Sequence, residues 1–363
     1  MPSTALTIAL VVLVAGCAAV SGFAGGYVYR GPGSTTSAGT ANNTLSVIAA
    51  GTLNTFFPQL GSLLANETPG SSAPSAAQTY EGSLDVTTAI NTLHARTDVT
   101  AVADFRLIPP RLEPTYASYE IVFAATPEVL VYDPSLPVFS GINASNWATK
   151  LVADVGTSGN APFAVWNAST DPNGYNEIFS LELQGLIDNG SAATYYRAFY
   201  GGAAGAPAVP NPTTTRVEKE SQAAALVNSK VVSALITYRS YAVVNHLHYV
   251  ALNATVGLSA SDPVALAEYA KLSTTIVGSN RALVTVAPAP VLFAVSVPSN
   301  APNPTLGAAF LHLLLSPQGA AVLSAGGAFV PIFPGWVDHP GSVPPVLAPD
   351  VIDLPAWASA FVT

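Results

Sequence analysis

Two short segments of the sequence share a pattern that can bind an anion. Each has a glycine and a hydroxyl residue where a helix is expected to begin: Ala50-Gly51-Thr52-Leu53 and Glu81-Gly82-Ser83-Leu84. The N-terminus of a helix offers unpaired N–H groups and a partial positive charge, which together hold an oxyanion without a basic side chain. A Ser or Thr hydroxyl adds a further donor. For either segment alone, the simpler interpretation is that Thr52 and Ser83 only cap their own helices.

A third segment, Asp171-Pro172-Asn173-Gly174-Tyr175, has the residue types that begin a helix. An aspartate carboxylate caps the first N–H groups, and proline suits the first helical position because no N–H is needed there. As an isolated motif, the segment predicts a helix start and nothing more.

The five histidines are scattered, and only two lie close together. His246 and His248 alternate, so on a strand they would share one face, a spacing that zinc can use. No Asp, Glu or Cys lies near them in the sequence, so two ordinary strand or loop histidines are the favoured interpretation. The sequence contains no Gly-x-Ser-x-Gly elbow, phosphate loop or His-Glu-x-x-His motif, and nothing in it indicates a Ser/His/Asp triad.

The elements that would position these residues alternate between strands and helices. A buried strand over 45–50 leads into a helix over 52–64, and a helix over 83–94 leads into a strand over 99–103. This order indicates an α/β domain with a mostly parallel sheet. The apolar stretches 120–131 and 289–297 suit strands that pass between two domains. Further expected elements are a helix over 221–228, a strand over 231–238, a helix over 305–315, a helix that begins at Ser316-Pro317, and an irregular strap over 340–355.

Charged residues are unusually sparse for a chain with room for two domains. They make up 9% of the 363 residues, and the net charge is −9, whereas an average soluble protein has ~25% charged residues. A nucleic-acid partner is not expected, because phosphate binding needs a basic footprint that this chain lacks. Sparse charge also suits an acidic exterior, where little repulsion develops as carboxylates protonate. We treat that environment as a hypothesis.

The N-terminus indicates export. No charged side chain occurs over residues 1–29, and the apolar run is long enough for the ~20 residues that cross a bilayer. The run either anchors the chain as an uncleaved helix or is a lipoprotein signal that ends at Cys17, the only cysteine; a flexible tether follows over 31–43. Six glycosylation sequons favour the same exterior: Asn42, Asn66, Asn143, Asn167, Asn189 and Asn253.

In this order, these segments resemble the molybdate/tungstate-binding proteins of archaeal-type ABC importers, over about residues 45–334. The family's Ala-Gly-Ser-Leu corresponds to Ala50–Leu53 with threonine for serine, its Gly-Ser to Gly82-Ser83, and its Asp-Pro-x-Gly-Tyr to Asp171–Tyr175. Further matching segments are Ala101–Asp104, Tyr238–Ser240, Pro298–Asn303 and Leu315–Gly319. No single piece is specific, but their collinearity covers most of the chain.

The resemblance implies a type II periplasmic-binding-protein fold, in which two α/β lobes are joined by two crossing strands and close over the anion. The implied divisions are an anchor (1–30), a tether (31–43), a first lobe (44–125 with 286–340), a second lobe (126–285) and a C-terminal strap (341–363). The implied partners are the oxyanion, an ABC permease with its ATPase, and the membrane through the N-terminal segment. The protein would be a monomer without a cofactor and would catalyse no reaction.

The resemblance also implies ligand-binding residues in each lobe. Those of the first lobe are Gly51, Thr52, Leu53, Gly82 and Ser83; those of the second are Asp171, Tyr175 and Thr237. Asp171 would reach the metal of the bound oxyanion directly. The family's second carboxylate ligand corresponds to Thr237 here, and a neutral threonine is a poor ligand for a hard metal. The site therefore holds either molybdate or tungstate, or another tetrahedral anion such as sulfate by hydrogen bonds alone, with Asp171 reduced to a helix cap. Two other classes remain open: a tethered secreted hydrolase and a structural surface protein.

Overall fold

The computed structural model describes residues 44–67, 77–155, 163–202, 204, 208–212, 214–278 and 282–362. The predicted N-terminal anchor, the tether and Cys17 lie outside these residues. Among the residues described, no single helix is long and apolar enough to cross a membrane. Only a helix pair bent by 68°, Pro304–Leu314 with Pro317–Gly327, meets the length and composition criteria when taken together.

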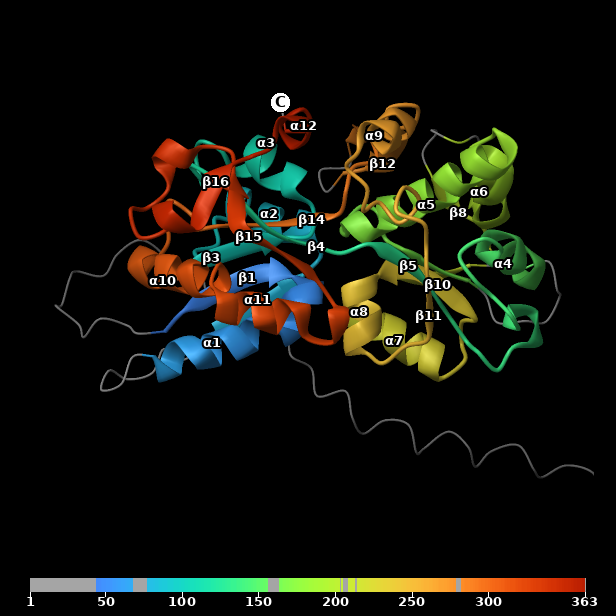
Figure 1. Ribbon diagram of the computed structural model, residues 1–363, viewed down its shortest axis with the longest axis horizontal. Helices are drawn as coiled ribbons and strands as arrows, with labels where there is room; N and C mark the ends of the chain where they lie inside the picture. Colours follow the sequence, from blue (N-terminus) through green and yellow to red (C-terminus); the bar gives the residue numbers. More distant parts are fainter. Residues whose placement is uncertain are drawn as a thin grey trace, which may run out of the picture. The chain divides into compact units, whose positions relative to one another are not determined.

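A seven-stranded sheet forms the part of the protein that we call the first lobe (Figure 1). Its strand order is β16-β15-β4-β14-β3-β1-β2. The bounds are β1 Ser46–Ala50, β2 Ala77–Glu81, β3 Val99–Val102, β4 Ile121–Ala125, β14 Leu292–Ser296, β15 Val330–Val337 and β16 Val351–Asp353. Helices of this lobe are α1 Phe57–Asn66, α2 Ser83–Asn91, α3 Ile108–Leu112, α10 Pro304–Leu314, α11 Pro317–Ser324 and α12 Ala356–Ser359.

Side chains alternate between the two faces of this sheet, and each face has its own helices. Phe123 and Phe293 belong to a core cluster that includes residues of α1 and α10, whereas Val122 and Ala294 belong to a second cluster with residues of α2, α3 and α12. Successive side chains of a strand point to opposite faces, so a strand buried on both sides is apolar throughout. The sandwich of two helix layers therefore explains the unbroken apolar runs of these strands.

A five-stranded sheet, in the order β11-β5-β10-β6-β9, forms the second lobe. The bounds are β5 Glu128–Tyr132, β6 Phe163–Trp166, β9 Thr215–Val217, β10 Ala234–Tyr238 and β11 Tyr249–Ala251. Its helices are α4 Trp147–Val155, α5 Pro172–Asn189, α6 Ala193–Phe199, α7 Glu220–Asn228, α8 Arg239–Val244 and α9 Pro263–Tyr269. Two small ribbons complete it: β7 Tyr200–Gly201 with β8 Val209–Pro210, and β12 Thr274–Val277 with β13 Leu283–Val286.

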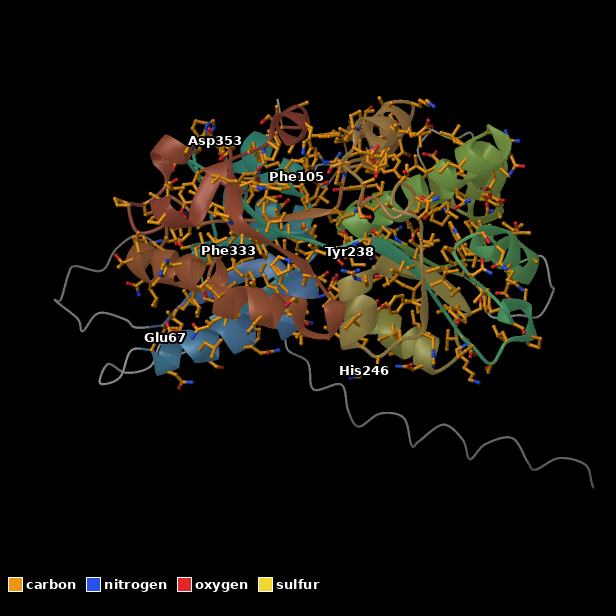
Figure 2. All side chains as sticks on the ribbon, viewed as in Figure 1. Glu67, Phe105, Tyr238, His246, Phe333 and Asp353 are labelled. Atoms are coloured by element: carbon orange, nitrogen blue, oxygen red, sulfur yellow. The ribbon has the colours of Figure 1, made fainter. Side chains whose placement is uncertain are left out.

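The chain crosses between the two sheets where the apolar stretches predicted it. The stretch 120–131 is not one strand, however: β4 belongs to the first sheet and β5 to the second, with Thr126-Pro127 between them. Proline has no N–H for a ladder, so the break falls at a residue that cannot continue a central strand. The chain returns to the first sheet through β14. Figure 2 marks Tyr238 of β10 near this junction, and its ring packs edge-on against Phe293 of β14 with the centroids 5.7 Å apart.

Three predictions about the elements were wrong in detail. The first sheet is mixed, not mostly parallel, because β14 pairs antiparallel with both β3 and β4 after the chain has crossed to the second lobe and back. Residues 52–64 form a 3₁₀ turn, Gly51–Thr55, followed by α1, whose second residue is Pro58. The tail expected to be irregular contains β16, which pairs in parallel with β15.

Candidate functional site

The loops that follow the strands of both lobes enclose a small cavity, which we call the cleft cavity. Its volume is about 110 Å³, which corresponds to roughly three to four water molecules of ~30 Å³ each. It therefore has room for a ligand of a few heavy atoms. First-lobe residues around it are Gly51, Asn54, Tyr80, Glu81, Gly82 and Asp85, and second-lobe residues are Asp171, Glu218, Lys219, Glu220 and Ser221.

Thr52, which follows the cavity-lining Gly51, contacts the other lobe. It is 5% exposed, and its Oγ1 donates a hydrogen bond to Oε1 of Glu220, the first residue of α7. The side chain of Thr52 therefore joins the two lobes, which the simpler interpretation as a cap of its own helix does not explain. Gly51 leaves the space for this contact, because a Cβ there would lie 2.5 Å from Glu220 Oε2. Leu53 is fully buried in the hydrophobic core.

Gly82 and Ser83 lie at the start of α2, where the two lobes touch. Leu84 N–H, in the first turn of α2, donates to the carbonyl oxygen of Thr170 in the second lobe (3.2 Å). A Cβ on Gly82 would lie 2.2 Å from the same oxygen, so only glycine permits this approach. Ser83 does not cap α2; its Oγ accepts a hydrogen bond from Ala103 N–H (2.8 Å) and so ties α2 to the end of β3.

Asp171 caps α5, as predicted. Its Oδ1 accepts a hydrogen bond from Asn173 N–H (2.9 Å), and Pro172 is the first residue of the helix. The same carboxylate lines the cleft cavity. Burial raises the pKa of Asp171 to about 6, helped by the charge of Asp85 and opposed by the bond from Asn173 N–H. The carboxyl group therefore takes up a proton in mildly acidic solution.

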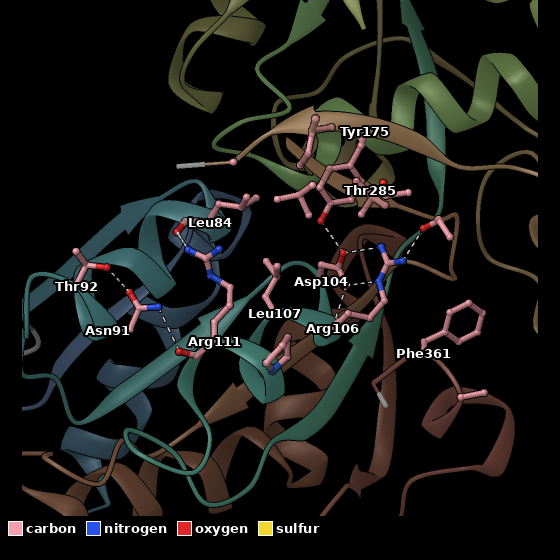
Figure 3. A pocket seen from close by; sticks show the side chains of 17 residues that line it. Leu84, Asn91, Thr92, Asp104, Arg106, Leu107, Arg111, Tyr175, Thr285 and Phe361 are labelled. Carbon is pink, nitrogen blue, oxygen red and sulfur yellow. Dashed lines mark hydrogen bonds and ion pairs between the residues drawn. The ribbon is translucent and has the colours of Figure 1, made fainter. Parts of the chain in front are cut away.

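Tyr175, one turn further along α5, joins the lobes at a different place. Its hydroxyl donates to Oδ2 of Asp104 (2.6 Å), and Arg106 holds both oxygens of that carboxylate (Figure 3). Burial raises the pKa of Asp104, but the charge and hydrogen bonds of Arg106 outweigh it and leave the pKa lowered. Tyr175 and Asp104 line a larger cavity of about 690 Å³ beside α2 and α3, not the cleft cavity.

Thr237 lies on β10 below the cavity, with no exposed surface. Its Oγ1 is 3.0 Å from the side-chain amide of Asn173, and with the amide N–H₂ turned toward Glu128 that amide contacts both Glu128 oxygens at 3.2 Å. Burial, and then the charges of Glu177 and Asp171, raises the pKa of Glu128 well above its usual value. Thr237 is therefore part of a buried polar network and does not line the cleft cavity.

The cleft cavity is rich in carboxyl groups and has one lysine, Lys219. Burial raises the pKa of Glu220 to about 8, and the charge of Asp171 adds to the shift while the bond from Thr52 opposes it. The pKa of Asp85 is also raised, first by burial and then by Glu81. Protonated carboxyls are hydrogen-bond donors, so Glu220 is mostly a neutral donor at neutral pH and Asp171 becomes one in mildly acidic solution.

The comparisons with known proteins agree with this architecture. The family model described as bacterial extracellular solute-binding protein matches residues 45–328. The chain belongs to this family. A molybdate/tungstate-binding protein, WtpA, of Pyrococcus abyssi is 23% identical over 303 residues, covering 80% of this chain and 85% of the relative. An uncharacterized solute-binding protein of Petrotoga mobilis is 26% identical over 282 residues, covering 77% and 82%.

Solved structures agree on the fold. The periplasmic molybdate-binding protein of Azotobacter vinelandii superimposes with a TM-score of 0.53 at 14% identity, covering 78% of this chain and 97% of that one. The substrate-binding protein of an ABC transporter from Agrobacterium tumefaciens gives a TM-score of 0.50 at 12% identity, with 77% of each chain covered. This solute-binding protein therefore has the mixed α/β fold of periplasmic binding proteins.

The fold of this solute-binding protein brings only part of the predicted ligand set to the cleft cavity. Gly51, Gly82 and Asp171 line it, and Thr52 reaches its Glu220. Four predicted residues do not line it. Leu53 is buried in the core, and Ser83, at the start of α2, bonds to Ala103 N–H. Tyr175 bonds to Asp104, and Thr237 belongs to the buried polar network.

Glu220 was not among the predicted ligand-binding residues. The predicted helix, 221–228, began one residue after it, and an acidic residue at the start of a helix is common because it stabilises the helix N-terminus. The pairing of Glu220 with Thr52 spans 168 positions in the chain. No local pattern indicates a contact at that separation.

The structure also bears on two predictions about residues outside the cleft cavity, the neighbouring histidines and the glycosylation sequons. His246 and His248 lie in the loop before β11, not on a strand, so they share no sheet face. Asn167, one of the six sequons, is 9% exposed and its Nδ2 donates to Glu218 Oε2 (2.6 Å). Its amide is therefore already engaged inside the fold, and Asn167 is a poor acceptor for a glycan.

Proposed function

We propose that this solute-binding protein captures a tetrahedral oxyanion, molybdate or tungstate, in the cleft cavity and delivers it to an ABC permease driven by a cytoplasmic ATPase. It acts as a monomer on the extracellular face of the membrane, held there by its N-terminal helix or by a lipid on Cys17, and catalyses no reaction. The observation that carries the proposal is the cleft cavity itself. Its volume is about 110 Å³, and it is lined by residues at the start of α2 in the first lobe and at the start of α5 in the second.

The donors of this site are neutral or are neutralised by protons. Thr52 supplies a hydroxyl that now donates to Glu220, and the first turn of α2 supplies backbone N–H groups, of which Leu84 N–H now bonds to Thr170. A bound anion would compete with these contacts or lie beside them. Protonated Glu220 would donate to an oxo group at neutral pH, and Asp171 would do so only in mildly acidic solution, where it takes up a proton. This mode needs no arginine, and none lines the cavity among the described residues.

The two carboxyl groups of the second lobe support molybdate or tungstate over sulfate. The carboxylate expected at position 237 is absent, but Glu220 and Asp171 together return two carboxyl groups to the site. Asp171, which is mostly ionised at neutral pH, offers a hard oxygen ligand of the kind that can complete the coordination of a Mo or W centre, which sulfur in sulfate cannot accept, while protonated Glu220 donates to an oxo group. Asp171 would then serve both as a helix cap through Oδ1 and as a ligand of the cargo metal.

Titration calorimetry of the full-length chain with tungstate, molybdate, sulfate and phosphate tests the proposal. We expect saturable binding of one equivalent of tungstate and molybdate, and binding of sulfate at least tenfold weaker. Thr52→Val should weaken binding, because it removes the hydroxyl and keeps the shape. Thr149→Val, in the second-lobe helix α4 and away from the cavity, is the matched control. Absence of heat with all four anions would overturn the oxyanion proposal, and stronger sulfate binding would overturn the choice of metal oxyanion.

A tethered hydrolase has less support. The histidine contacts present among the described residues are with Tyr116, Asp350, Glu113 and Asp338, and none involves a serine hydroxyl. A nucleophile and its base need to lie within hydrogen-bond reach.

A further inference from the structure

Three side chains of the types that can bind metals meet at one end of the first-lobe sheet, and none of them lines the cleft cavity. They are Glu113, in the loop after α3, and Asp338 and His339, which follow β15. The strand register places them together: β4 and β15 are antiparallel with Val337 opposite Ile121, so Asp338 lies opposite Glu120. Figure 2 labels Asp353 of β16, the residue paired with Val337, which marks this end of the lobe.

The distances between the three groups suit a common ion. One ligand atom from each lies within 4.8 Å of the other two. His339 Nε2 is 3.3 Å from Glu113 Oε2 and 3.9 Å from Asp338 Oδ2. Two ligands bound at about 2.1 Å in tetrahedral positions lie about 3.4 Å apart. The two His339 distances therefore lie within about 0.5 Å of that spacing.

Asp338 is already oriented for this role. Its Oδ1 accepts hydrogen bonds from the backbone N–H groups of Glu120 (2.8 Å) and His339 (2.7 Å). Its Oδ2 has no hydrogen-bond partner and is buried, and the side chain as a whole is 8% exposed. In a metal-binding carboxylate, one oxygen usually contacts the ion while hydrogen-bond donors of the protein hold the carboxylate in place.

The surroundings also gather buried carboxyl oxygens that have no hydrogen-bond partner. Glu120, directly opposite Asp338, is fully buried, and neither of its oxygens has a partner. Glu113 Oε1 is likewise buried without a partner. Among the described residues, the ion pairs of Glu113 and Asp338 are with His339 alone, and no Lys or Arg is paired with them. Three carboxyl groups and one imidazole in this space need either protons or a cation.

We propose that Glu113, Asp338 and His339 form a binding site for a divalent transition-metal ion, with Zn²⁺ as its best occupant. An imidazole with two carboxylates is a ligand set that zinc accepts, with water in the fourth position, whereas Mg²⁺ and Ca²⁺ prefer oxygen ligands only. The bound ion ties the loop after α3 to the end of β15. It stabilises the first lobe and does not touch the oxyanion.

Zinc titration of the full-length chain at pH 7, prepared without a polyhistidine tag, tests the site, because a bound divalent ion displaces protons from its ligands. We expect one equivalent of Zn²⁺ to bind and to raise the melting temperature, with Mg²⁺ having no such effect. His339→Ala and Glu113→Gln should each raise the Kd for zinc at least tenfold. His339 is 60% exposed, so its truncation leaves no internal cavity, and Glu113→Gln keeps the side-chain shape.

His312→Ala is the matched control, because His312 is a similarly exposed histidine (54%) that contacts a carboxylate, Asp350, elsewhere on the lobe. It should bind zinc as the unmodified chain does. Lack of stoichiometric zinc binding by the unmodified chain would show that a proton shared by Glu113 and Asp338 balances the charge, and would overturn the proposal. Zinc affinity equal to that of the unmodified chain in both His339→Ala and Glu113→Gln would overturn the proposal as well, and so would loss of binding in His312→Ala.

Discussion

Replacing Glu220 by glutamine tests how the cleft cavity accepts an anion. The substitution keeps the size of the side chain and resembles the protonated carboxyl, which contacts Thr52 and faces Gly51. With a pKa of about 8, the Glu220 carboxyl is about nine-tenths protonated at pH 7 and about one-tenth protonated at pH 9. If the anion binds only the protonated form, its apparent affinity equals the affinity for that form multiplied by the protonated fraction of Glu220.

The expected change follows from this arithmetic. Between pH 7 and pH 9 the Kd of the unmodified chain for tungstate should rise about tenfold, which is about 1.4 kcal/mol. In Glu220→Gln the Kd should be close to constant over the same range, because the titrating group is gone. Asp171, with a pKa of about 6, is ionised throughout this range and does not contribute to the slope.

Isothermal titration calorimetry at fixed ionic strength is the appropriate assay, because salt also screens the charged side chains around the cleft cavity and so changes the Kd independently of pH. Glu218→Gln is the matched control: Glu218 lines the same cavity, but its side chain is half exposed and paired with Arg216. It should keep the full pH dependence. A flat profile for the unmodified chain, or an equally steep one for Glu220→Gln, would refute the reasoning.

Three further predictions concern stability and closure. The pKa of Glu128 is raised in the folded state, so the folded chain holds that proton more tightly than the unfolded chain. The contribution of this group to stability should be complete below about pH 4.3 and should fall by about 1.4 kcal/mol per pH unit as pH rises toward the folded pKa. The melting temperature of Glu128→Gln should therefore fall less with rising pH than that of the unmodified chain. Gly82→Ala should weaken tungstate binding more than tenfold, because its Cβ meets the Thr170 carbonyl at 2.2 Å and holds the lobes apart. Tyr175→Phe removes a buried bond to the charged Asp104, typically worth about 1.5–3 kcal/mol, and should lower both melting temperature and tungstate affinity.

The Gly82 and Tyr175 predictions each have a control in the same chain. Gly341→Ala adds a Cβ that meets nothing within 4 Å, so binding should be unchanged. Tyr116→Phe removes an exposed hydroxyl that contacts His94, so its melting temperature should change little. An equal change of melting temperature with pH in Glu128→Gln and in the unmodified chain would contradict the Glu128 argument, and full affinity in Gly82→Ala or Tyr175→Phe would contradict the proposed closure.

Much of the fold could be predicted from local patterns. The strands that became β1, β3 and β14 are apolar runs of the length of a buried strand, and the structure confirms them. The caps at Asp171 and Ser316 are also confirmed, because the side chain that satisfies each helix start lies beside it in the sequence. The direction of pairing could not be predicted, since it depends on how often the chain crosses between the lobes.

The candidate site was likewise predicted only in part from the sequence. The glycines at positions 51 and 82 mark strand ends that approach the other lobe, and the sequence pattern identified both. The partners they approach, Glu220 and Thr170, lie 169 and 88 positions away, and only the closed arrangement of the lobes shows why a Cβ is not tolerated there. Thr237 illustrates the opposite case, because its position in the family pattern suggested a ligand and its burial with Asn173 made it part of the core.

The sequence by itself determined the class of this protein: sparse charge, an apolar N-terminus, and strand ends with Gly-Thr and Gly-Ser helix starts. Local residue types are sufficient for these conclusions because capping, chain export and strand burial depend on neighbours along the chain. Only the tertiary structure decided which carboxyl groups share the cleft cavity, and that Glu113 meets Asp338 and His339 across 225 positions. Pairings at such separations depend on sheet register and lobe contact, and the resulting burial, not residue type, sets the pKa values of the groups involved.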